Sequence, residues 1–178
     1  MVLTVVLFVA SLFWRIMPML EANMMAGKRE TIRALTTTAV SALAGFEEDE
    51  RRGLLTRDEA QAQAVAHLRQ LRYGPELKDY FWINDQTPRM IMHPNRPDIE
   101  WRDVSQFTDP QGKRIFHECV QTGASQGSGF VDYSWQWKDD PERIVPKISY
   151  VTEFQPWGWI VGTGIYVEDV RAEISAIT

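Results

Sequence analysis

The first twenty residues form an almost unbroken apolar run. Residues 1–14 carry no charge, and their only polar side chains are Thr4 and Ser11. A membrane-spanning helix needs about 20 predominantly apolar residues, so we interpret residues 1–20 as a transmembrane segment shortened at its N-terminal end. The run lacks the basic start and cleavage site of a secretory signal. A buried core helix is the alternative interpretation.

Beyond this run, apolar residues recur every three or four positions, which predicts an amphipathic helix from Met25 to about Gly53. The predicted stripe consists of Met25, Ile32, Leu35, Ala39, Ala42 and Phe46. Such a stripe packs either on the domain that the helix supports or on a second copy of the chain. The second option underlies our expectation of a homodimer.

A second helix is predicted from its capping signals. Thr56 and Glu59 form a capping box, in which each side chain bonds to a free backbone amide of the first turn. We expect an inner face of Ala60, Ala64, Leu68 and Leu71, and an end at Gly74–Pro75.

After residue 78 the chain becomes rich in aromatic and β-branched residues, as in a sheet. We predict five strands, at residues 80–84, 89–93, 129–137, 147–154 and 159–167. A helix should open at Asp109–Pro110 and end at Gly123, and a last helix should occupy 168–178 and lead toward a second membrane span. The predicted fold class is α+β, with helices packed on a mostly antiparallel five-stranded sheet in a PAS-like plan.

Charge and motifs exclude several functions. The net charge of -5 argues against a nucleic-acid partner. The sequence contains no GxSxG, P-loop or HExxH motif, and His67, His93 and His117 lie in separate predicted elements. We therefore expect no catalytic residues, no metal site and no cofactor.

Aromatic residues with polar groups alternate along two predicted strands. Tyr80 and Trp82 share one strand face, as do Tyr133 and Trp135 on another strand. Such rings suit a ligand cavity, because the ring excludes water while the hydroxyl or indole N–H can bond to a ligand. They would equally serve as core beneath helices.

Lys147 is the most informative charge. It lies in an apolar, β-branched segment, where a buried lysine is costly unless it meets an anion. The alternative is an edge-strand lysine with its ammonium in water. Tyr150 is a further candidate, but in a regular strand it faces the side opposite Lys147.

Two further residues are candidate ligand contacts. His93 could donate to a carboxylate, or it could be a hydrogen-bonded structural histidine. Arg72 could clamp a carboxylate, but we favour a role in capping the carbonyls that end the preceding helix.

Several motifs together resemble the single Cache domain of the sCache_2 type. They are LRYG at 71–74, DYFWIND at 79–85, MHP at 92–94, GSGFVDYSW at 127–135, VPKISYV at 145–151 and PWGWIVGTGIYVEDV at 156–170. The resemblance implies one sensor domain over residues 21–170, as found in bacterial chemoreceptors, sensor histidine kinases and cyclase receptors. Trp101 stands where the family commonly has glycine, and its ring could reshape the loop beside the pocket.

The resemblance and the residues predict an extracytoplasmic sensor domain of a bacterial inner-membrane receptor. The expected ligand is a small organic acid, such as a short-chain carboxylate, and binding would displace a helix across the membrane. The alternative is a dimerisation or interaction ectodomain with no small-molecule ligand of its own.

Overall fold

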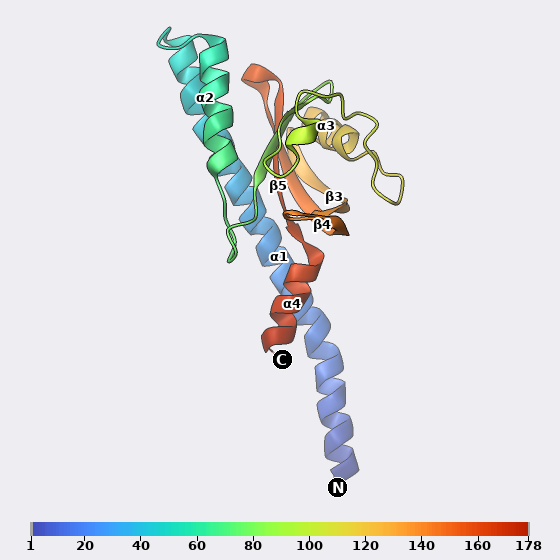
Figure 1. The fold of residues 1–178 in the computed structure, drawn as a ribbon. Coiled ribbons are helices and arrows are strands. Elements are labelled where there is room, and N and C mark those ends of the chain that lie inside the picture. The colour runs from blue at the N-terminus through green and yellow to red at the C-terminus, as the bar shows by residue number, and fades with distance from the viewer. Residues whose placement is uncertain (1, 178) are drawn as a thin grey trace.

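The computed structural model describes residues 2–177, with side chains from 14 to 176. It confirms the α+β fold class: a five-stranded antiparallel sheet lies between α1 and α2 on one face and α3 on the other (Figure 1). The helices are α1 (Val2–Arg51), α2 (Arg57–Gln70), α3 (Ile115–Gln126) and α4 (Val167–Ile177). The strands are β1 (Phe81–Asp85), β2 (Met90–Met92), β3 (Ser128–Trp137), β4 (Asp140–Phe154) and β5 (Trp159–Tyr166).

The long helix α1 carries its apolar stripe against the sheet of its own domain. Ile32, Thr36, Ala39 and Leu43 are at most 2% exposed, and α1 packs on β4 and β5. The buried part of the stripe thus packs on the sheet of its own domain, and no second copy of the chain is needed to cover it.

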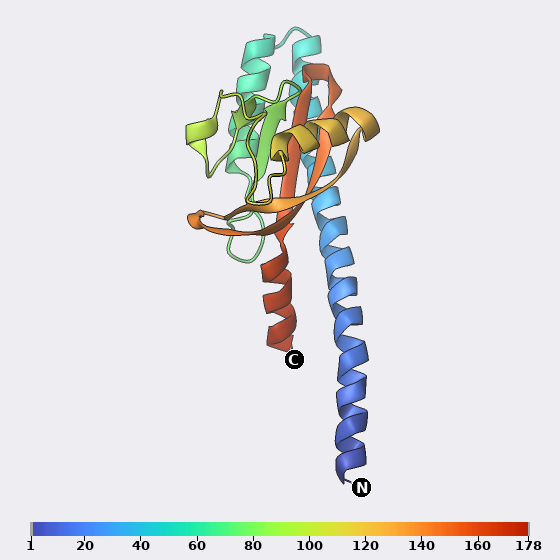
Figure 2. The same ribbon diagram turned by 90° about the vertical axis from the view of Figure 1, so that its right-hand side faces the viewer.

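The predicted membrane segment lies mostly outside the described side chains, which begin at Trp14. Among the described residues, no helix combines the length and the apolar character that a membrane crossing requires. Trp14, Ile16 and Met19 are exposed on the part of α1 that extends away from the sheet (Figure 2).

The capping box of α2 is confirmed. The Thr56 hydroxyl accepts from the Glu59 amide, and the Glu59 carboxylate accepts from the Thr56 amide at 2.9 Å. The helix ends at Gln70 rather than at Gly74, because residues 71–79 form an extended turn closed by a bridge between Tyr73 and Asp79.

The strand order β2-β1-β5-β4-β3 makes β4 an interior strand. β3 and β4 form one long hairpin, and β4 begins at Asp140, seven residues before the predicted start. Lys147 is paired with Tyr133 on one side and Tyr166 on the other. This pairing fixes the residues that surround Lys147.

The helix α3 begins and ends later than predicted. Asp109 caps a turn instead of opening the helix, since its Oδ1 atom accepts from the amides of Gln111 and Lys113. Gly123 lies inside the helix, where a Cβ atom would come within 2.6 Å of the Ile160 side chain. The chain leaves α3 at Gly127, which has a φ of 74°.

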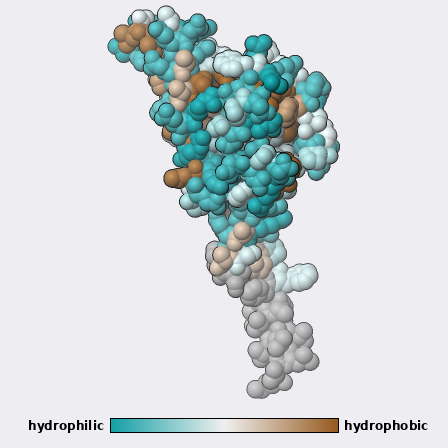
Figure 3. All heavy atoms as spheres, viewed as in Figure 1, coloured by the Kyte–Doolittle hydropathy of each residue, from teal (hydrophilic) through white to brown (hydrophobic). Residues whose placement is uncertain are grey.

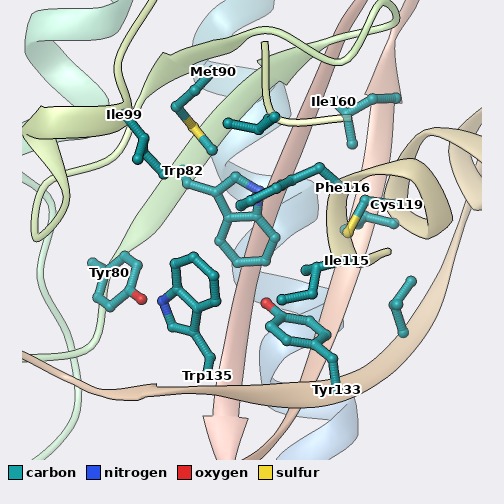
Figure 4. Close-up of a cluster of buried hydrophobic side chains, with 13 residues drawn as sticks. Tyr80, Trp82, Met90, Ile99, Ile115, Phe116, Cys119, Tyr133, Trp135 and Ile160 are labelled. Atoms are coloured by element: carbon teal, nitrogen blue, oxygen red, sulfur yellow. The ribbon is translucent and has the colours of Figure 1, made fainter. Parts of the chain in front are cut away.

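Each face of the sheet has its own hydrophobic core. As the alternation predicts, Phe81 and Ile83 pack toward α1 and α2, whereas Tyr80 and Trp82 pack toward α3. Figure 4 shows the second core, in which aromatic side chains from β1 and β3 converge. The surface above these cores is largely hydrophilic in Figure 3, apart from small apolar spots that include the tip of the α1–α2 hairpin, where Leu54 is exposed.

Candidate ligand-binding site

Lys147 is buried in the core that faces α3. It is 2% exposed, and its Nζ atom donates to the hydroxyl oxygens of Tyr80 at 3.1 Å and Tyr166 at 3.4 Å. Because β4 is an interior strand, the alternative of an edge-strand lysine in water is wrong.

Three aromatic rings surround the ammonium. Its nitrogen lies 4.3 Å from the ring centre of Tyr80, 4.8 Å from that of Tyr166 and 5.5 Å from that of Trp82. We call these three residues the aromatic cage. A cation attracted to ring faces is partly stabilised by the electrons of the rings, but the cage supplies no negative charge.

The positive charge of Lys147 has no contacting negative charge among the described side chains. Among the side chains that the structure describes, no carboxylate forms an ion pair with this ammonium; Asp79 attracts it from a greater distance. Burial lowers the pKa of Lys147 to about 7, and the attraction to Asp79 opposes this shift. Burial also raises the pKa of Tyr80 well above 10, so this hydroxyl stays neutral and cannot act as the counter-ion.

His93 lies beside the cage and is 2% exposed. Its ring centre is 4.9 Å from that of Tyr80 and 5.6 Å from that of Trp135. Burial lowers its pKa well below 6.5, with Lys147 adding to the effect, so the imidazole is neutral. Within the described part of the chain its Nδ1 atom has no hydrogen-bond partner, which is costly for a buried polar atom.

Trp135 and Tyr133 complete the surroundings on the β3 side. The indole nitrogen of Trp135 points toward the Tyr80 hydroxyl (Figure 4). The Tyr133 hydroxyl lies 2.9 Å from the Ser149 hydroxyl. The structure therefore gathers six of the eight candidate residues: Tyr80, Trp82, His93, Tyr133, Trp135 and Lys147.

Arg72 and Tyr150 lie elsewhere. The Arg72 guanidinium donates to the carbonyl oxygens of Arg69 at 2.6 Å and Leu71 at 2.9 Å, as capping requires. Tyr150 lies on the opposite face of the sheet, where its ring packs against Phe130 and Arg33. No bulge in β4 brings Tyr150 round to the side of Lys147.

Sequence reasoning missed Tyr166. This residue is the last of β5 and shares the ammonium with Tyr80. Tyr166 lies opposite Lys147 because of the register in which β5 pairs with β4. The sequence of one strand alone does not specify this register. The sequence signal is a tyrosine at the end of a strand in which Thr163 is the one other residue with a side-chain hydroxyl.

The cage is sealed from solvent. One hollow of about 360 Å³ is bordered by Trp135 and Arg96, and another of about 600 Å³ by Tyr166 and Asp79. Lys147 is not among the residues that line either hollow, so the expected open cavity around the lysine is instead a closed cage flanked by two hollows.

The ring of Trp101 lies on the surface and does not enter the site. Its side chain is 64% exposed, and its backbone has a φ of 65°, the left-handed region that favours glycine. This conformation gives a physical reason for a glycine preference at the position. Within the described residues, no group of three or more His, Cys, Asp or Glu side chains is placed to hold a metal ion.

Two solved structures match this architecture. One is described as a periplasmic sensor domain of a chemotaxis protein; it is 44% identical, with a TM-score of 0.77, over 81% of this chain and 98% of that one. The other is described as the structural basis for carboxylic acid recognition by a Cache chemosensory domain. It is 42% identical, with a TM-score of 0.77, over 82% of this chain and 97% of that one.

A curated relative and a family assignment agree with the structures. The methyl-accepting chemotaxis protein McpP of Pseudomonas putida is 42% identical over 88% of this chain, which spans 28% of the length of that relative. Such sensor domains bind ligands without transforming them, which confirms the expectation of a non-enzymatic domain. The family model described as Single Cache domain 2 matches residues 24–178, and the chain belongs to this family of sensor domains.

Proposed function

We propose that this Cache domain senses a small carboxylate, which it binds with Lys147 as the cationic anchor and His93 as a second polar contact. One observation carries the proposal: two buried groups that lack partners among the described residues lie against the Tyr80 ring. They are the Lys147 ammonium, which no carboxylate contacts, and the His93 Nδ1 atom. A single small anion would satisfy both. The relative described as recognising carboxylic acids supports the same ligand class.

The surroundings favour an anion with few atoms. A charge-assisted hydrogen bond from a buried ammonium contributes roughly 1.5 to 3 kcal/mol. That is a large share of the affinity of a two- or three-carbon acid. The apolar side chains around Lys147 exclude water and strengthen this interaction, while offering little room for a longer chain.

Entry into the sealed cage needs a side chain to move. Trp135 borders the 360 Å³ hollow, and its indole nitrogen points toward the Tyr80 hydroxyl. The ligand would reach Lys147 from this hollow when the indole ring turns aside. Arg96 borders the same hollow, with its guanidinium 5.9 Å from the Trp135 ring centre and paired with Asp98 at 2.7 Å.

The receptor context is part of the proposal. Residues 1–20 would anchor the chain in the bacterial inner membrane, with the sensor domain outside the cytoplasm and α4 leading to a second span. The receptor would act as a homodimer through a surface other than the part of the α1 stripe that packs on the sheet of its own domain. Its output would reside in parts of the protein beyond this chain.

A second candidate is an interaction ectodomain that binds no small molecule. It is favoured by the sealing of the cage, since Lys147 borders neither of the two hollows. In that case the aromatic cage would be part of the structural core, and the domain would bind another protein through its outer surface.

Calorimetric titration of the chain with acetate, propionate and the neutral isostere acetamide separates the two candidates. The proposal predicts saturable heat from an acid and none from acetamide. Lys147→Met should abolish it, whereas Lys113→Met, at a partly exposed lysine outside the cage, should leave it unchanged. Absence of saturable heat from both acids would favour the interaction ectodomain, whereas an unchanged response in Lys147→Met would exclude Lys147 as the anchor of the acid.

A further inference from the structure

Lys138 occupies an unusual position at the turn between β3 and β4. Although charged, it is only 3% exposed, and its φ is 50°. A side chain in this left-handed region costs about 1 to 2 kcal/mol relative to ordinary backbone. Such residues persist where the surroundings hold them in several ways at once.

The backbone of Lys138 is bonded to the surroundings of the ligand site. Its amide donates to the Tyr166 Oη atom at 2.9 Å, the same oxygen to which Lys147 donates at 3.4 Å. Its carbonyl oxygen accepts from Asn95 at 2.9 Å, and Asn95 follows His93 by two residues. Lys138 is thus connected to both proposed ligand contacts, through Tyr166 on one side and Asn95 on the other.

The side chain of Lys138 reaches in the other direction, to the exit helix. Its Nζ atom lies 3.1 Å from an Asp169 carboxylate oxygen and 3.5 Å from one of Glu76. Asp169 belongs to the first turn of α4 and also accepts from the Trp137 indole at 2.9 Å. Tyr166, a residue of the cage, is followed directly by Val167, the first residue of α4.

The exit helix in turn contacts α1. Lys28 of α1 forms an ion pair with Glu173 at 2.7 Å, and Arg171 forms one with Glu21 at 3.1 Å. In Figure 1 the two helices run side by side away from the sheet. A movement at the first turn of α4 is therefore a movement relative to α1.

We propose that Lys138 is the coupling residue that transmits occupancy of the cage to α4. The inference rests on the proposed function, because it requires an anion to bind Lys147. The anion draws the Lys147 ammonium away from Tyr166, which removes one of the bonds that hold the Tyr166 hydroxyl. Tyr166 and the Lys138 turn then shift, and the bond from Lys138 to Asp169 carries the shift, about 1 to 2 Å in comparable transitions, into α4.

Amide hydrogen exchange of α4 tests the coupling, with acetate and propionate as probes at concentrations that saturate the calorimetric signal. In the wild-type chain, ligand should change the exchange rates of amides 170–174, which are bonded within α4, at least about threefold, since exchange reports local opening of a helix. Helix α2, which lies outside the proposed path, serves as the internal reference. Absence of calorimetric binding would refute the proposed function, whereas binding without a response in α4 would refute the coupling alone.

Two variants break the contact outside the ligand site. Asp169→Asn removes the nearer of the two carboxylate charges that Lys138 meets, the one that belongs to α4, and leaves Glu76 in place. Lys138→Gly removes the ammonium but suits the positive φ and keeps the amide and carbonyl bonds, so folding is preserved. Both should bind the acid within about threefold of wild type and lose the α4 response.

Glu168→Gln is the matched control. Glu168 lies on the same turn of α4 as Asp169, and it forms an exposed 2.7 Å ion pair with Arg143 of β4. The substitution breaks this ion pair, which is outside the proposed path. The control should retain both affinity and the α4 response. A response that persists in Asp169→Asn and Lys138→Gly, or an affinity that falls more than tenfold in them, would overturn the coupling role of Lys138.

Discussion

The Lys147 ammonium contacts Tyr80 in two ways: its nitrogen lies 3.1 Å from the hydroxyl oxygen and 4.3 Å from the centre of the ring. Neither contact supplies a full negative charge. The protein therefore holds a cation in its core at a cost in stability, and the predictions below follow from that cost.

Replacing Lys147 by methionine should stabilise the ligand-free protein. The folded-state pKa, about 7, lies below the usual value of 10.5, so between these values the unfolded chain binds more protons. The free energy of unfolding of the wild type should thus rise with pH over this window, by up to about 1.4 kcal/mol per unit. Below pH 7 the full cost is present.

Thermal unfolding at pH 6 and pH 10 measures this effect. Lys147→Met should unfold at a higher temperature than the wild type at pH 6, and the difference should shrink toward pH 10. A variant that is less stable than the wild type at pH 6 would mean that the cage compensates the charge without a ligand.

Affinity for acetate should fall as the pH rises through 7. Above this value the free protein loses the Lys147 proton, and part of the binding free energy of the anion is used to protonate Lys147 again. The expected loss approaches tenfold per pH unit. Calorimetry in buffers of different ionisation enthalpy should reveal proton uptake on binding at pH 8, and an affinity that is constant from pH 6 to 9 would exclude the Lys147 ammonium as the anchor.

His93→Leu tests the second polar contact. Loss of one hydrogen bond to a charged ligand should weaken binding about tenfold, equivalent to roughly 1.5 kcal/mol. The melting temperature should not fall, because the variant also removes a buried nitrogen that has no partner among the described residues. His67→Leu on α2, where the ring packs beside Phe46, provides the control and should bind as the wild type does.

Trp101→Gly tests whether the loop residue matters for the site. Glycine relieves the positive φ, so stability should stay the same or increase by about 1 kcal/mol. Because the ring is exposed, affinity for acetate should stay within about twofold. A large change in affinity would show that the Trp101 ring influences the cage through its loop.

Much of the fold follows from local patterns. The capping residues Thr56 and Glu59 and the alternation from Tyr80 to Ile83 were sufficient to place α2 and the two faces of β1. Helix ends were less predictable, since Gly123 resembles a terminator but is needed for close packing with Ile160.

The site was only partly predictable. The apolar neighbours of Lys147 in sequence favour its burial, and parity separates it from Tyr150, but only the strand order excludes an edge-strand lysine in water. The contribution of Tyr166 and the turn at Lys138 depends on strand register and on tertiary contacts, which a single sequence does not specify. The sealing of the cage likewise depends on how side chains from different strands pack together.

The most direct test of the account is the pKa of Lys147, measured by NMR from the side-chain resonances of the isotopically labelled chain with and without saturating acetate. Without ligand, the group should titrate near pH 7. With acetate, a carboxylate at the ammonium should raise the pKa by at least about one unit. An unchanged pKa in the presence of bound acetate would contradict the claim that Lys147 is the anion anchor.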